Sequence, residues 1–211
     1  MTDILQKIAS NLYNGEQKEV AQLVEQALAQ GLAPGEVLQG GLITGMEQVG
    51  RDFKAGDLFV PEVLIAARAM QAGMNVLRPL LGENDPVNAG KYVIGTVKGD
   101  LHDIGKNLVK MMLEGAGFQT IDLGTDVAAD AFVAAVRTHR PKLLGMSALL
   151  TTTMVNMKAI VDALEEAGLR ESVKIMVGGA PVTAAFAAQI GADAYAPDAA
   201  TAVDVARSLT K

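Results

Sequence analysis

Apolar residues in the first eighty positions recur every three or four residues, which is the spacing of one helical face. The longest such run steps by four and three alternately, as in the seam of a packed helix: Val63, Ala67, Met70, Met74, Leu77 and Leu81. Gly31 and Pro34 bracket a turn, and Pro61 suits the first position of a helix. We therefore expect four helices, over residues 2–13, 16–30, 35–54 and 61–81.

The pattern changes after this region. Gly, Asn, Asp and Pro cluster between residues 82 and 90, which is typical of a linker. Strand-like runs then alternate with helix-like runs; the strand-like ones cover residues 92–96, 119–123, 142–147, 174–177 and 193–196. Regular β–α alternation predicts a parallel sheet covered by helices on both faces. We predict a four-helix bundle (1–83), a linker (84–90) and a Rossmann-like, flavodoxin-like five-stranded parallel α/β domain (91–211).

Composition narrows the function classes. The chain has 211 residues, of which 50% are hydrophobic, and no cysteine, so it has no thiolate with which to bind a metal. Its net charge is -6, and its Lys and Arg residues are scattered, which argues against a nucleic-acid surface. No apolar run approaches the roughly 20 residues of a membrane span. We expect a cytoplasmic protein that binds neither nucleic acid nor membrane.

The segment from Gly99 to Val109 is the strongest candidate for chemistry. It contains His102, one of only two histidines, between Asp100 and Asp103. The segment follows the first predicted strand, so His102 should lie at the carboxyl edge of the sheet, where ligands of open α/β sheets bind. A neutral imidazole is a good ligand for a transition metal, and a neighbouring carboxylate can hold its other nitrogen.

Other interpretations of these residues are weaker. The pair Gly105-Lys106 matches the end of a P-loop, but Asp100 replaces the first glycine of that motif and Asn107 replaces its closing Ser or Thr. There is also no Gly-x-Gly-x-x-Gly after the strand. His139 ends a predicted helix beside two arginines, where it suits the helix dipole.

The motif Asp100-x-His102-x-x-Gly105 resembles the signature of cobalamin-binding domains in which a histidine ligates cobalt. Further matches follow in the expected order: Phe59-Val-Pro61-Glu-Val63 before it, then Ser147-Ala-Leu149 with Thr151 and Thr153, and Gly178-Gly179. Together they resemble the corrinoid proteins of anaerobic methyltransferase systems, which are related to the cobalamin-binding module of methionine synthase. The resemblance covers nearly the whole chain.

This resemblance implies roles for particular residues. His102 would be the lower axial ligand of cobalamin bound base-off, and Asp100 and Thr153 would extend its hydrogen-bond chain. The residues implied in cofactor binding at the sheet edge also include Asp103, Ile104, Gly105, Ser147, Leu149, Thr151, Gly178, Gly179 and Tyr195; of these, Ser147, Leu149 and the two glycines line the slot for the nucleotide tail, and Tyr195 closes it. Phe59, Val63 and Met70 would cover the upper face of the corrin. Without the resemblance, the hydroxyls are interpreted as helix caps, the glycines as a tight turn and the apolar residues as core.

The resemblance also implies a function. The chain would carry a methyl group on cobalt, alternating between methylcobalamin and Co(I), from a substrate-specific methyltransferase to a second methyltransferase with a tetrahydrofolate or thiol acceptor. A reductive activation protein would be a third partner, and the chain would not be catalytic alone. Two alternatives stay open: a cobalamin-dependent sensor or regulator, and the cobalamin subunit of a mutase.

Overall fold

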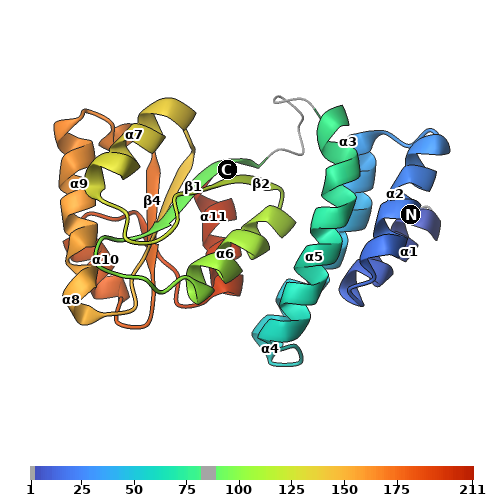
Figure 1. The fold of residues 1–211 in the computed structure, drawn as a ribbon, viewed down its shortest axis with the longest axis horizontal. Helices are drawn as coiled ribbons and strands as arrows, with labels where there is room; N and C mark the ends of the chain where they lie inside the picture. The colour runs from blue at the N-terminus through green and yellow to red at the C-terminus, as the bar shows by residue number, and fades with distance from the viewer. Residues whose placement is uncertain (1–2, 82–88) are drawn as a thin grey trace. The chain divides into compact units, whose positions relative to one another are not determined.

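The computed structural model describes residues 3–81 and 89–211, and the chain divides into two compact units. The helical unit is built mainly from the residues before 90, and the sheet unit mainly from those after (Figure 1). The expected linker, residues 84–90, lies outside the described residues except for Ala89 and Gly90. Within the described ranges, no helix is long and apolar enough to cross a membrane.

The helical unit has the four long helical segments that the apolar spacing predicts. They are α1 (Asp3–Tyr13), α2 (Gln17–Ala29), a third made of α3 (Pro34–Val37), η1 (Leu38–Ile43) and α4 (Thr44–Ala55), and α5 (Val60–Leu77), which the short η2 (Arg78–Leu80) follows. Helix α5 packs against α2. Large side chains from all four segments are buried; the fully buried ones include Ile8, Leu12, Leu42, Met70 and Leu77.

The third segment departs from the prediction of one regular helix over 35–54, because η1 is a π-helix. Glycines of this segment face α1 closely: a Cβ on Gly40 would lie 2.9 Å from Leu5 Cδ1, and one on Gly41 would lie 2.9 Å from Ile8 Cγ2. The Thr44 hydroxyl donates to the carbonyl five residues earlier at 2.9 Å. Close packing against α1 therefore accompanies the local widening of the helix.

The sheet unit confirms the predicted five-stranded parallel α/β fold. Its strands are β1 (Gly90–Thr96), β2 (Phe118–Asp122), β3 (Leu143–Ser147), β4 (Lys174–Gly178) and β5 (Ala194–Tyr195), in the order β2-β1-β3-β4-β5. Helices α6 (Ile104–Gly115) and α11 (Ala199–Leu209) cover one face; α7 (Ala129–His139), α9 (Asn156–Glu166) and α10 (Ala184–Gln189) cover the other (Figure 1). The short α8 (Thr151–Met154) and η3 (Arg170–Ser172) complete the unit.

Strand register brings the ends of the central strands level with one another. Thr96 pairs with Ser147, and Ser147 pairs with Gly178, so β1, β3 and β4 end side by side. The chain leaves β1 toward β2 on one side and later returns to β3 on the other. This is the topological switch point at which open α/β sheets bind ligands.

The hydrophobic core of the sheet unit supports the central strands. Buried side chains of β1, β3 and β4 pack with those of α7 and α9, including Val93, Phe132, Leu144, Ile160 and Ile175. Gly95 leaves room for an aromatic ring, because a Cβ there would lie 2.8 Å from Phe132 Cζ. The loops at the carboxyl edge therefore stand on a tightly packed support.

Candidate functional site at the carboxyl edge of the sheet

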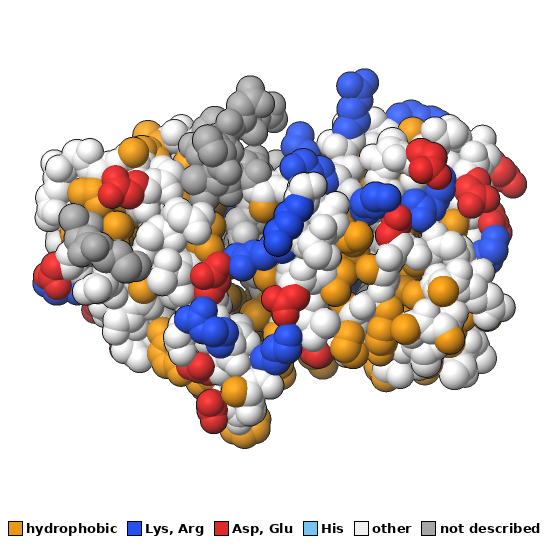
Figure 2. All heavy atoms as spheres, turned by 180° about the vertical axis from the view of Figure 1, so that it is seen from behind, with side chains coloured by type: hydrophobic (Ala, Val, Ile, Leu, Met, Phe, Trp, Pro, Cys, Tyr) orange, Lys and Arg blue, Asp and Glu red, His pale blue; other side chains and the backbone are white. Residues whose placement is uncertain are grey.

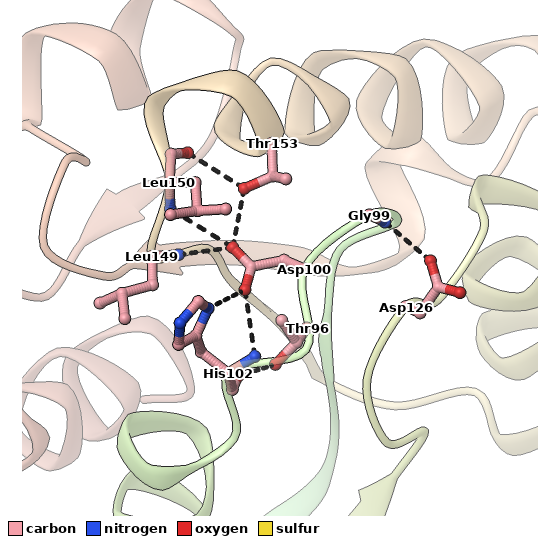
Figure 3. A network of polar contacts seen from close by, with 8 residues as sticks. All are labelled: Thr96, Gly99, Asp100, His102, Asp126, Leu149, Leu150 and Thr153. Carbon is pink, nitrogen blue, oxygen red and sulfur yellow. Dashed lines mark hydrogen bonds and ion pairs between the residues drawn. The ribbon is translucent and has the colours of Figure 1, made fainter.

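The centre of the site is the buried carboxylate of Asp100, in the loop between β1 and α6 (Figure 3). Asp100 is 0% exposed. Its Oδ1 accepts two hydrogen bonds from His102, one from ring Nδ1 at 2.6 Å and one from the main-chain N–H at 3.1 Å. The carboxylate thus fixes both the backbone and the ring of His102.

The other oxygen of Asp100 is held by the segment after β3. Asp100 Oδ2 accepts from the main-chain N–H of Leu149 at 2.7 Å, from that of Leu150 at 3.4 Å and from the Thr153 hydroxyl at 2.7 Å. The Thr153 hydroxyl also lies 3.0 Å from the Leu150 carbonyl. Since it has one proton, donation to the charged carboxylate is the stronger choice. Asp100 therefore joins two loops that are far apart in the sequence.

These hydrogen-bond donors keep the Asp100 carboxylate ionised. Burial alone would raise the pKa of Asp100, but the hydrogen bonds from Thr153, Leu149 and His102 outweigh it, so the pKa lies well below its ordinary value. An ionised Asp100 accepts only, so Nδ1 of His102 carries the ring proton. The side chain of His102 is 52% exposed. In a neutral ring with this tautomer Nε2 carries the lone pair, and the half-exposed ring is accessible as a metal ligand.

Further contacts hold the loop that carries His102. The Thr96 hydroxyl donates to the His102 carbonyl at 2.9 Å, and the Gly99 N–H donates to Asp126 Oδ1 at 2.7 Å. In the first turn of α6, the buried Lys106 ammonium donates to both carboxylate oxygens of Asp122, at 2.6 and 2.7 Å. The loop is thus tied to β2 and the segment after it at both of its ends.

Sequence reasoning does not single out Asp126, Lys106 or Asp122 for these roles. A Gly, Thr and Asp after a strand signals only a turn, and the Gly105-Lys106 pair draws notice only as part of a phosphate loop. The pairing of Lys106 with Asp122 depends on β2 lying beside β1. Periodicity cannot show that juxtaposition before the strand order is known.

The remaining loop residues named from the sequence surround His102. Ile104 is 77% exposed, and Leu101, beside His102 in the chain, is 74% exposed. A Cβ on Gly105 would meet nothing within 4 Å. Asp103 directly precedes α6, and its Oδ2 accepts from the Asn107 side chain at 3.1 Å. The chain on either side of His102 therefore carries exposed apolar side chains, and Gly105 leaves open space beside the backbone.

The residues named after β3, β4 and β5 lie at the same edge of the sheet. Ser147 ends β3 and is half-buried, Leu149 and Thr151 are exposed, and Tyr195 in β5 is half-buried. Leu149 contacts Asp100 directly through its N–H. The geometry thus brings together Asp100, His102, Leu149 and Thr153.

Gly178 and Gly179 allow close approach of the protein's own backbone. A Cβ on Gly178 would lie 2.8 Å from the carbonyl oxygen of Ala196. Gly179 has a φ of +122°, and a Cβ there would overlap the carbonyl oxygen of Ala148. The tight turn that the sequence suggests is therefore present, and its glycines are required for packing.

Phe59, Val63 and Met70 belong to the helical unit, at the start of α5 and within it. Val63 and Met70 are buried, whereas Phe59 is 67% exposed. The Phe59 N–H donates to Glu62 Oε2 at 3.0 Å, which caps the first turn of α5. Of the three, Phe59 presents its side chain to solvent.

Charge is mixed on one face of the molecule. On the face drawn in Figure 2, Lys and Arg side chains are interspersed with Asp and Glu side chains. Orange apolar side chains also gather on the same face. This distribution differs from the single basic patch typical of a nucleic-acid surface.

Comparison with known proteins gives the family. Residues 4–78 and residues 90–204 each match a family model described as a B12 binding domain. The chain is 44% identical over 211 residues to trimethylamine corrinoid protein 2 of Methanosarcina mazei, covering 99% of this chain and 97% of that protein. It is 43% identical over 208 residues to a dimethylamine corrinoid protein of Methanosarcina barkeri, covering 98% of this chain and 97% of that protein. Among solved structures, it is similar to a chain of the methanol:cobalamin methyltransferase complex MtaBC from Methanosarcina barkeri, with a TM-score of 0.90, 32% identity and coverage of 99% of this chain and 80% of that one.

Proposed function

This chain belongs to the family of B12-binding corrinoid proteins, and we propose that it carries a methyl group on the cobalt of cobalamin, bound base-off with His102 as the lower axial ligand. The observation that carries this proposal is the His102–Asp100 pair at 2.6 Å, which leaves the half-exposed ring with Nε2 available at the carboxyl edge of the sheet. Imidazole nitrogen ligands of this kind suit cobalt.

The residues present fit a corrinoid. A single imidazole can complete the coordination of a metal that a macrocycle already holds. The exposed apolar side chains of Leu101, Ile104 and Leu149 would lie against the flat ring system, since they surround His102 in the chain or contact its partner Asp100. Ser147, Thr151, Gly178, Gly179 and Tyr195, at the ends of β3, β4 and β5, would line the slot for the displaced nucleotide tail.

Bound cobalt supplies the chemistry, because it accepts a methyl group from one partner and gives it to another. The protein's contribution is control of one proton. If Nε2 of His102 held the metal, Asp100 would keep the ring proton on Nδ1 and fix the orientation of the ring. Because the pKa of Asp100 lies well below its ordinary value, the carboxylate stays ionised and the proton stays on Nδ1.

The proposed partners follow from the same role. The similarity to a chain of a methanol:cobalamin methyltransferase complex supports docking to a substrate:cobalamin methyltransferase. The higher identity to trimethylamine and dimethylamine corrinoid proteins favours a methylamine as the methyl donor. A second methyltransferase would remove the methyl group. A reductive activation protein would reduce cobalt that has become oxidised, so that it can accept a methyl group again. The trimethylamine and dimethylamine corrinoid proteins match this chain along nearly their whole length. This similarity supports the carrier role and lends no support to the sensor or the mutase alternative.

The test is the spectrum of the loaded protein. We expect apoprotein loaded with methylcobalamin to show the histidine-ligated, base-off absorption spectrum, and the His102→Ala variant to bind cobalamin more weakly with a spectrum lacking that ligand. An unchanged spectrum in the variant would refute His102 as the ligand. Separately, efficient demethylation of a methylamine by the loaded chain alone would refute the carrier role.

A further inference from the structure

One residue at this edge of the sheet, outside the Asp-x-His-x-x-Gly motif, has an unusual backbone conformation. Asp126, in the turn between β2 and α7, has a φ of +56°. Left-handed backbone is unfavourable for residues with a side chain, although Asp tolerates it better than most. Such a conformation persists only where surrounding contacts favour it. The contacts of Asp126 therefore indicate its role.

Those contacts end on the loop that carries His102 (Figure 3). Asp126 Oδ1 accepts from the Gly99 N–H at 2.7 Å, and the Asp126 N–H donates to the Asp100 carbonyl at 3.0 Å. Gly99 has a positive φ as well, +81°. We propose that Asp126 is a positioning residue for the cobalt ligand: it holds Gly99 and Asp100 so that His102 is presented in its metal-binding geometry before the cofactor arrives. This inference rests on the proposed function of His102.

The segment around Asp126 is anchored without this side chain. The Val127 N–H donates to the Thr96 carbonyl at 3.0 Å, and the Thr96 N–H donates to the Gly124 carbonyl at 2.9 Å. These main-chain bonds continue the pairing of β1 with β2. The exposed Asp126 carboxylate therefore adds little to the fold, and its specific effect falls on Gly99.

Loss of this contact should act through preorganisation. If the loop occupies its binding geometry only part of the time, the apparent affinity falls by that fraction, so occupancy of one tenth weakens binding about tenfold. Changes to residues that orient a metal ligand weaken metal binding by about 10- to 100-fold. We expect the low end of this range, because Asp126 acts on the loop and not on the imidazole.

Three substitutions separate the carboxylate from the backbone conformation. Asp126→Gly accepts the positive φ freely but removes the acceptor; Asp126→Asn keeps an acceptor oxygen and tolerates the positive φ; Asp126→Ala loses both advantages. Asp130→Ala is the matched control, because Asp130 is an exposed carboxylate nearby in the chain whose Oδ1 accepts from the next residue's N–H.

Two measurements on the full chain test the proposal. Hydrogen exchange of the Gly99 amide in the apoprotein should be faster in Asp126→Gly and Asp126→Ala than in the parent, and unchanged in Asp130→Ala. Titration with hydroxocobalamin should show about tenfold weaker binding for the same two variants, with Asp126→Asn within about twofold of the parent.

The outcomes distinguish this inference from the proposed function. Asp126→Gly with parental exchange and parental affinity would overturn the inference, and so would Asp126→Asn as weak as Asp126→Gly. If His102→Ala leaves the cobalamin spectrum unchanged, the proposed function fails. In that case faster exchange of the Gly99 amide would show only that Asp126 orders the loop. The claim that Asp126 positions a cobalt ligand would then fail together with the proposed function.

Discussion

Replacement of Asp100 by Asn should destabilise the apoprotein, although the two side chains have the same shape. Asp100 accepts hydrogen bonds from main-chain N–H groups on both oxygens: from His102 on Oδ1 and from Leu149 on Oδ2. An asparagine has one acceptor oxygen and one NH₂ donor. In either orientation the NH₂ group faces a main-chain N–H, and one partly buried N–H is left without its acceptor.

The magnitude follows from the hydrogen bonds that the substitution removes. An unpaired buried donor costs about 1–3 kcal/mol, and hydrogen bonds to a charged group contribute about 1.5–3 kcal/mol against about 1 kcal/mol for neutral ones. The Thr153 hydroxyl can turn to the Leu150 carbonyl, 3.0 Å away, which recovers part of the stability. We expect the free energy of unfolding to fall by about 3 kcal/mol.

Urea denaturation of the apoprotein at neutral pH, followed by circular dichroism, measures this change. Asp130→Asn is the control, since the exposed Asp130 carboxylate accepts from its neighbour's N–H; its free energy of unfolding should stay within about 0.5 kcal/mol of the parent. A decrease of less than about 1 kcal/mol for Asp100→Asn would refute the argument that these donors stabilise the buried, ionised carboxylate.

Three further predictions concern the stability of the sheet unit. Thr153→Val should lower the free energy of unfolding by about 2 kcal/mol in urea denaturation, and Thr153→Ser should recover most of it, because the hydroxyl donates to a charged acceptor; equal stability of the two would contradict this. Asp193 accepts from the Ile175 N–H and from Arg170 and Lys174; burial alone would raise its pKa, but these contacts lower it below its ordinary value. The ionised Asp193 therefore stabilises the fold above about pH 4, and this contribution disappears as the pH falls further. The loss of unfolding free energy caused by Asp193→Asn should accordingly be smaller at about pH 3 than at about pH 7. A loss that is the same at both pH values would contradict this role of Asp193. Gly179→Ala should cost about 3 kcal/mol in urea denaturation or prevent folding, whereas Gly168→Ala, with positive φ but nothing within 4 Å, should cost about 1 kcal/mol; equal costs would show that the overlap with the Ala148 carbonyl relaxes.

Much of the fold was predictable because each element has a single strong signal. The strands of the sheet unit are short apolar runs separated by turn residues, and each helix between them has an apolar face. The π-helical segment was not predictable in this way. Gly40 and Gly41 resemble ordinary interruptions of a helix, and their packing against Leu5 and Ile8 is visible only in three dimensions.

Part of the candidate site was also predictable from the sequence, and part was not. His102 and Asp100 are close in the sequence, so their pairing follows from the motif, and the resemblance to corrinoid proteins added Thr153. The contacts of Leu149 with Asp100 and of Asp126 with Gly99 join segments separated by 49 and 27 positions. They depend on strand order and on one left-handed residue, neither of which apolar periodicity encodes.

The double anchoring of Asp100 also bears on how the protein is made. Its partners include Thr153, 53 residues further along the chain. A nascent chain that has not yet placed β3 beside β1 has the histidine motif and the His102 donors to Asp100 Oδ1, but it lacks the Leu149 and Thr153 donors that hold Oδ2. If the proposed function holds, we expect cofactor acquisition to follow synthesis and folding of at least the first three strands. A chain truncated before β3 should then fail to retain cobalamin despite carrying the complete Asp-x-His-x-x-Gly motif.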